Sequence, residues 1–237
     1  MKRKIWRWLA LGVAMLLVAS GLFLAASFHH PTEKAAEVSQ TAIDQKGYLA
    51  FEGGDKVPLI VYPGALVDSA SYSIWAQQLA QAGHSVYLLK VPLDLAVLAP
   101  DQAEKVLAAF PEKDFVLVGH SLGGVMASRF IHNHPERIKG MIFLASYPDE
   151  KGKLPENLPV LSLTASQDQV LNWESYDAAK RFLPKTTVYE EISGGNHAGF
   201  GSYGKQSGDG TATITNATQQ QEIAKLMTQW LAQFSEK

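Results

Sequence analysis

The amino-acid sequence predicts an α/β protein with a mostly parallel sheet and helices on both faces. Two observations lead to this fold class. Short, continuously apolar runs alternate along the chain with segments whose apolar residues recur at helical spacing. Strands that are apolar at successive positions are typical of parallel strands covered on both sides. The chain has 237 residues, 46% of them hydrophobic, which is enough to bury the core of one such domain.

The first half of the alternation is bounded by turn-forming and helix-stopping residues. Pro63 and Pro92 follow the first two expected strands, while Gly83 and Pro135 follow two of the expected helices. Asp101 is a suitable N-cap for the helix between them. The expected strands are 56–62, 84–91 and 115–118, and the expected helices are 71–82, 101–110 and 122–134.

The second half continues the pattern to the end of the chain. Two apolar runs, GMIFLA and LPVLSLT, predict strands with a proline-containing loop between them. The last segment predicts an amphipathic helix, with Ile223, Met227 and Trp230 among the apolar residues of one side. The expected strands are 140–145, 158–164 and 186–192, and the expected helices are 173–183 and 218–234. We therefore expect one domain over residues 47–237.

The first 28 residues predict export. Four basic residues precede position 9, and residues 9–28 carry no charge. A basic cluster before an apolar stretch is typical of a signal peptide, and the small residues 25–27 fit a cleavage site. About 20 apolar residues also suffice to span a bilayer as an uncleaved anchor. Both alternatives place the remaining chain outside the cytoplasmic membrane, secreted or held at it. Residues 29–46 are polar and weakly patterned, and are predicted to be a linker.

Charge and composition exclude several classes of function. Without the four N-terminal basic residues the chain has 17 basic and 23 acidic residues, which argues against nucleic acid as a partner. The absence of cysteine excludes disulfides, thiolate metal sites and a cysteine nucleophile. His132 and His134 are two residues apart on an expected helix, which points their rings apart, so we expect no metal and no cofactor.

The sequence GHSLGG places Ser121 where an apolar strand ends and an apolar helix begins. G-x-S-x-G in this context is typical of a strained turn that exposes a nucleophilic serine. Ligands of parallel sheets bind outside the carboxyl ends of the strands, which is where Ser121 falls. The alternative is a glycine-rich turn that happens to contain serine. We predict that Ser121 is a nucleophile.

A serine nucleophile needs a base, and the base needs an orienting acid. His197 is the only histidine that follows the last expected strand. Asp168 comes directly after strand 158–164, while Asp149, which also follows a strand, is a rival in a charged and more solvated segment. We predict His197 as the base and Asp168 as the acid, because nucleophile, acid and base then follow in the order typical of this kind of site.

The reaction also needs N–H donors for a developing oxyanion. The backbone N–H of Leu122 is one, because it follows the nucleophile. The second is expected from the loop after the first strand of the alternation, where Ala65 is our choice and Leu66 the alternative.

Residues 47–234 resemble the α/β-hydrolase superfamily, in particular the small bacterial subgroup labelled alpha/beta hydrolase family 5. The resemblance lies in three segments that follow in this order: VYPGALVD, GHSLGGVMASRF and GGNHAGFGSYGKQSGDGTATIT. The resemblance implies a triad of Ser121, Asp168 and His197, and marks the Gly-Asp-Gly run around Asp209 as a hallmark without a role that the sequence assigns. Many members have His-Gly where this chain has Pro63-Gly64, which makes the second oxyanion donor less secure. About a dozen residues separate positions 145 and 158, where related lipases insert a cap domain, so no helical lid is expected.

These observations predict a serine hydrolase that cleaves carboxylic esters of small molecules or lipids, with short or medium acyl chains. Serine rather than aspartate at position 121 argues against a haloalkane dehalogenase or an epoxide hydrolase. Thioesterase, lysophospholipase, peptidase and acyltransferase activities use the same triad and stay open. A second class, a surface binding protein on a hydrolase scaffold, also stays open, although no triad residue is missing.

Overall fold

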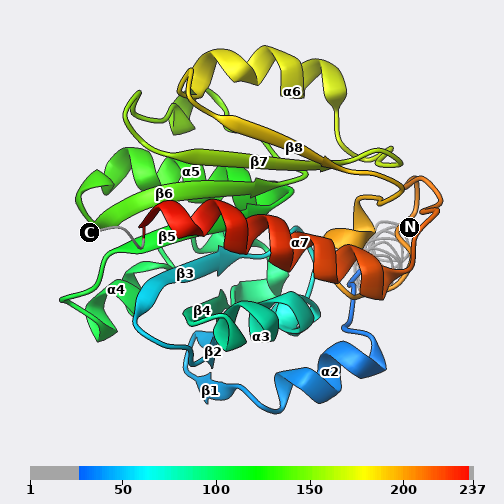
Figure 1. The fold of residues 1–237 in the computed structure, drawn as a ribbon, viewed down its shortest axis with the longest axis horizontal. Helices are drawn as coiled ribbons and strands as arrows, with labels where there is room; N and C mark the ends of the chain where they lie inside the picture. The colour runs from blue at the N-terminus through cyan, green and yellow to red at the C-terminus, as the bar shows by residue number, and fades with distance from the viewer. Residues whose placement is uncertain (1–26, 235–237) are drawn as a thin grey trace, which may run out of the picture.

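Figure 1 shows the computed structural model of the chain, in which residues 27–234 are described. Eight strands form one sheet in the order β1-β2-β4-β3-β5-β6-β7-β8. Strands β3 to β8 are mutually parallel, and β1 and β2 add an antiparallel edge. The strands are β1 Ile43–Gln45, β2 Tyr48–Phe51, β3 Lys56–Tyr62, β4 His84–Leu89, β5 Phe115–His120, β6 Ile138–Leu144, β7 Val160–Ala165 and β8 Val188–Ile192.

Helices cover both faces of the sheet, as the apolar strands predict. Helices α3 (Ser73–Gln81) and α7 (Asn216–Leu231) pack together against one face, where Trp75 and Met227 are fully buried. Helices α4 (Glu104–Ala109) and α5 (Leu122–Asn133) bury their apolar residues against the other face. In Figure 1 helix α7 crosses in front of the sheet and α5 lies behind it. The predicted fold class is confirmed.

The expected elements of the alternation all form, with bounds that differ by a few residues. Helix α4 begins at Glu104, so the prediction of Asp101 as its N-cap was wrong. Helix α6 (Trp173–Ala179) ends earlier than expected and continues as the 3-10 turn η6 (Lys180–Phe182). Strand β4 ends at Leu89, and the next N–H, that of Lys90, donates to the Gly47 carbonyl (2.8 Å). Helix α7 begins at Asn216, because the side chain of Thr215 caps it by accepting from the Thr218 N–H.

The segment 29–46, predicted as a linker, is instead folded onto the domain. It holds helix α2 (Glu33–Ser39) and β1, and Val38 of α2 is buried in the core. Strands β1 and β2 form a hairpin around Lys46 and Gly47, and β2 pairs with β4. Gly47 has φ +112°, a conformation that glycine adopts without strain.

Residues 145–159, between β6 and β7, contain only the one-turn helix η5 (Glu150–Gly152), so no helical lid is present there. Across the described residues, no helix has the length and apolar character needed to cross a membrane. The predicted signal or anchor segment, 1–28, lies almost wholly outside the described residues.

Candidate active site

Ser121 lies at the turn between the end of β5 and the start of α5. Its backbone has φ 51° and ψ −124°, a region that residues with a side chain rarely adopt. Two hydrogen bonds to the end of β6 and the residues after it hold Ser121 there. The Ser121 N–H donates to the Leu144 carbonyl (3.1 Å), and the Ser146 hydroxyl donates to the Ser121 carbonyl (2.6 Å). This is the strained strand-to-helix turn that the G-x-S-x-G pattern predicts.

The glycines of the turn allow strand and helix to approach closely. A Cβ atom added at Gly119 would lie 2.3 Å from the Cα of Gly124, in the first turn of α5. One added at Gly123 would lie 2.4 Å from the backbone oxygens of Tyr62 and Pro63. Both are closer than a carbon atom can approach, so glycine is needed at these two positions of the motif.

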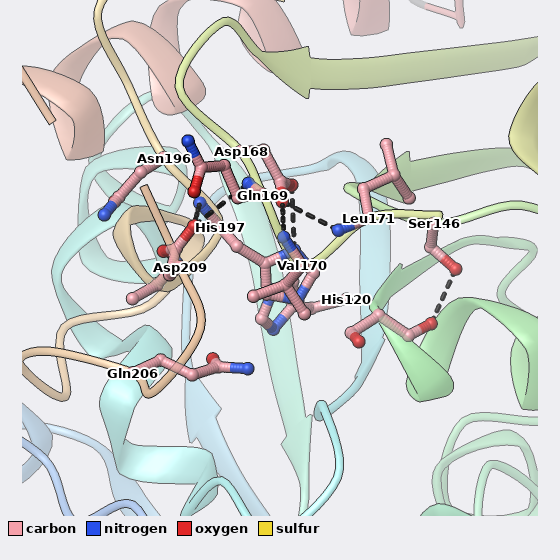
Figure 2. A network of polar contacts seen from close by, with 12 residues as sticks. His120, Ser146, Asp168, Gln169, Val170, Leu171, Asn196, His197, Gln206 and Asp209 are labelled. Carbon is pink, nitrogen blue, oxygen red and sulfur yellow. Dashed lines mark hydrogen bonds and ion pairs between the residues drawn. The ribbon is translucent and has the colours of Figure 1, made fainter. Parts of the chain in front are cut away.

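His197 and Asp168 form a buried hydrogen-bonded pair, shown in Figure 2. The Nδ1 atom of His197 lies 2.8 Å from Oδ2 of Asp168. The other carboxylate oxygen of Asp168 accepts from the backbone N–H groups of Val170 (2.9 Å) and Leu171 (2.8 Å). Asp168 follows β7 and His197 follows β8, so neighbouring parallel strands bring acid and base together. Because Nδ1 is engaged by Asp168, Nε2 of His197 is left for the nucleophile.

Ser121 and His197 line the same cavity of about 260 Å³ at the carboxyl ends of the strands. Its remaining lining residues come from the start of α5 and from the loops after β6 and β7: Leu122, Val125, Ala145, Ser146, Tyr147, Val170, Leu171 and Asn172. A larger cavity of about 560 Å³ lies at the opposite end of the sheet, around Lys56 and Asp114, and no triad residue lines it. We place the candidate site in the smaller cavity, because both the predicted nucleophile and the predicted base line it.

The loop after β3 is where the sequence predicts the second oxyanion donor. The Gly64 N–H donates to the Tyr72 hydroxyl (2.9 Å), the Leu66 N–H to the Asp94 carbonyl (2.7 Å) and the Val67 N–H to the Gly64 carbonyl (3.3 Å). Leu66 is therefore not available to an oxyanion. Within the described part of the chain, the Ala65 N–H has no acceptor, although Ala65 is not among the residues that line the cavity. Ala65 stays a prediction, whereas Leu122 lines the cavity beside Ser121.

His120 is buried between Tyr72, which holds the loop after β3, and His197. Its Nδ1 atom lies 2.9 Å from the Tyr72 hydroxyl, and its ring centroid lies 4.8 Å from that of His197. The Tyr72 hydroxyl accepts from Gly64, so its own hydrogen is free to point to Nδ1 of a neutral His120. Burial, together with the nearby His197, lowers the pKa of His120 well below its ordinary value. His120 is therefore held neutral next to the triad.

Asp209, for which the sequence assigns no role, holds together the two loops that carry the acid and the base. Its carboxylate accepts from the backbone N–H group of Ala198 (2.8 Å). It also accepts from the N–H groups of His197 (3.3 Å) and Gln169 (3.4 Å), which Figure 2 shows. The flanking Gly210 is needed because a Cβ atom there would lie 1.9 Å from the Gln167 carbonyl oxygen. In the sequence, the Gly-Asp-Gly run marked Asp209 as notable, but the contacts that give it a role come from segments distant along the chain.

The alternative acid, Asp149, and the two histidines considered for a metal site, His132 and His134, contact groups outside the catalytic cavity. Asp149 pairs with the guanidinium of Arg129 and caps η5, and Arg129 lowers the pKa of Asp149. His132 lies 3.2 Å from the Lys153 carbonyl, while His134 stacks on Phe130. Throughout residues 27–234, no group of three or more potential ligands is placed to hold a metal ion.

The comparison with protein families agrees with this geometry. Residues 58–221 match the alpha/beta hydrolase family. The chain belongs to this family. Membership supports hydrolase activity of the α/β type, and the matched segment contains Ser121, Asp168 and His197.

Several solved structures have the same fold at low sequence identity. An α/β hydrolase from the metagenome of lagoon sediments of Mar Chica, Morocco, is 14% identical, with a TM-score of 0.61 over 81% of this chain and 98% of the other. A monoacylglycerol lipase from Paleococcus ferrophilus is 17% identical, with a TM-score of 0.58 over 81% and 100%. A dienelactone hydrolase from Anabaena variabilis is 14% identical, with a TM-score of 0.57 over 81% and 96%. At these identities the likeness extends to the fold alone.

Proposed function

We propose that the protein is a serine hydrolase that cleaves carboxylic esters through an acyl-enzyme. One observation carries the proposal: a serine on a strained turn lines the same cavity as a histidine whose other ring nitrogen is bonded to a buried aspartate. A nucleophile, a base and an orienting acid in this arrangement are the requirements of acyl transfer by serine.

In the first half of the reaction, the Ser121 Oγ attacks the ester carbonyl carbon while Nε2 of His197 takes its proton. Asp168 holds the ring in the correct tautomer and stabilises the imidazolium. The N–H groups of Leu122 and Ala65 donate to the oxyanion. When the tetrahedral intermediate collapses, the C–O bond to the alcohol breaks, and His197 returns the proton to the departing alkoxide.

In the second half, water attacks the acyl-enzyme carbonyl while His197 again takes the proton. Collapse of this intermediate returns the proton to Ser121 and releases the carboxylic acid. The cavity of about 260 Å³ is below the range of about 300–1,000 Å³ that is usual for pockets of drug-sized ligands. This size favours short or medium acyl chains.

The proposal extends to location. The basic N-terminus and the uncharged stretch 9–28 favour export, with the catalytic domain outside the cytoplasmic membrane and either held there by the uncleaved segment or released after cleavage.

Labelling by a fluorophosphonate probe tests the catalytic proposal. We expect the wild-type protein to label, Ser121→Ala not to label, and His197→Ala to label about a thousandfold or more slowly, because the serine loses its base. The matched control is His132→Ala, an exposed histidine that should leave the labelling rate unchanged. A folded wild-type protein that stays unlabelled would favour a binding protein on a hydrolase scaffold. Hydrolysis of p-nitrophenyl, thioester and lysophospholipid substrates then separates the chemistries that share the triad.

A further inference from the structure

An apolar ridge, made of Leu93, Val97 and Leu98, projects into solvent at the active-site end of the molecule. Their exposed fractions are 57%, 49% and 54%, and they account for three of the seven exposed large hydrophobic residues in the described chain. The ridge lies in the loop after β4, at the carboxyl edge of the sheet. None of the three lines the catalytic cavity, so they are not a wall of the acyl site.

The ridge is tied through backbone hydrogen bonds to the start of the described chain. The Asp94 carbonyl, next to Leu93, accepts from the Leu66 N–H (2.7 Å). The Leu66 carbonyl in turn accepts from the His29 N–H (2.7 Å), and His29 forms a parallel β-bridge with Val67. In Figure 1 the described chain begins, in blue, at the end toward which the strand arrows point.

These bonds leave no linker between the uncharged stretch 9–28 and the catalytic domain. His29, the first residue after that stretch, is already hydrogen-bonded to Leu66 in the loop after β3. The Thr32 N–H then donates to the Ser202 carbonyl (2.7 Å), and α2 begins at the next residue. If 9–28 enters a membrane, the domain is held with its active-site end at the lipid surface.

We infer that the apolar ridge contacts the lipid bilayer, so that the catalytic cavity lies at the membrane surface. The inference rests on the proposed export and anchoring, and the contact itself does not depend on the catalytic step. Asp68 and Asp94 beside the ridge are half-buried, and Asp101, which follows Leu98 in the chain, is exposed, so anionic lipid does not attract this face. Apolar contact therefore carries the interaction, and a tethered domain needs little intrinsic affinity because its effective concentration at the surface is high.

Depth-dependent quenching tests the contact in the full chain. The protein has no cysteine, so Val97→Cys carries a single environment-sensitive fluorophore, and Glu112→Cys is the matched control. Glu112 is exposed and precedes β5, whose length places it about 20 Å from the Ser121 end of the sheet. Both variants are reconstituted into phosphatidylcholine vesicles, with and without lipids that carry a nitroxide on the acyl chain. We expect at least twofold quenching of the Val97 label and little quenching of the Glu112 label.

Three results overturn the inference. The first is equal quenching at both positions, and the second is a chain that does not float with the vesicles. The third is a blue-shifted Val97 label that nitroxide lipids do not quench, because the ridge is then covered by protein, either the N-terminal segment or a second copy. Fluorophosphonate labelling of the same samples reports separately on catalysis, so failure of the proposed function is distinguishable from failure of the contact.

Discussion

At the scale of single residues, we expect Asp209, a side chain outside the predicted triad, to position the acid and the base. The carboxylate accepts from N–H groups of the Asp168 loop and of the His197 loop, and Asp209 itself does not line the cavity. Asp209→Asn replaces one acceptor oxygen by an amide that cannot accept from these N–H groups. We expect kcat for p-nitrophenyl acetate to fall about 10- to 100-fold with KM little changed, because small misplacements of a base cost this much.

Active-site titration with the fluorophosphonate separates positioning from folding. Loss of kcat per titrated serine is the expected outcome for Asp209→Asn. A lower titratable fraction with unchanged kcat per site would instead mean that Asp209 only stabilises the fold. The matched control is Asp177→Asn on α6, an exposed residue paired with Lys180, which should change neither quantity.

At the scale of elements, the junction of β5 and α5 depends on the absence of a side chain at Gly119. A methyl group there meets the backbone of Gly123 and Gly124, which cannot move without shifting the helix that positions Ser121. We expect Gly119→Ala to lower the free energy of unfolding by about 3 kcal/mol, as overpacking against backbone does, and to abolish labelling of Ser121. Urea unfolding measures the first effect and the fluorophosphonate probe the second.

The control for this substitution is Gly54→Ala, whose added Cβ would lie 3.4 Å from the Gly83 oxygen, an ordinary contact. Gly54→Ala should leave the free energy of unfolding within about 0.5 kcal/mol of the wild-type value. Similar unfolding curves for both variants would contradict the importance of the close approach.

The elements also differ in how well the sequence predicts them. Parallel strands that are buried on both faces are recognisable by their apolar runs, and helices by the spacing of their apolar residues, so β3 to β7 and α3 to α7 were predictable. Strand β8 is an edge strand with only Ile192 buried, and its place in the alternation indicated it. The edge strands β1 and β2 have three and four residues and exist through pairing with β4, which local pattern does not reveal. Polar α2 looks like a linker, because only Ala35 and Val38 of its seven residues are buried.

At the scale of the whole molecule, the fold brings together residues that the sequence predicts only one by one. Chain order singled out His197 and Asp168, and their 2.8 Å contact agrees with that choice over Asp149. The roles of Tyr72, His120 and Asp209 were not predictable, because each acts through partners 8 to 48 residues away along the chain. The same end of the molecule carries the cavity, the apolar ridge and the start of the described chain.

The stability of the whole domain should depend on two buried histidines that lack an acidic partner in the described structure, His120 and His84. His84 contacts the Val57 carbonyl (2.8 Å), and burial lowers the pKa of both rings. Below pH 6.5 the unfolded chain binds protons that the folded one does not, so stability is retained above this pH and is lost as the pH falls below it. Each histidine contributes a slope of at most about 1.4 kcal/mol per pH unit.

We therefore expect the free energy of unfolding in urea to fall between pH 7 and pH 5.5, and His120→Gln and His84→Gln each to remove part of that slope. His132→Gln, at an exposed position, should leave the wild-type slope intact. Equal slopes in all four proteins would mean that both buried rings protonate in the folded state. The packing of His120 argues against this, because aromatic rings, those of Phe200 and Tyr203 among them, enclose it and no carboxylate faces it to compensate a charge.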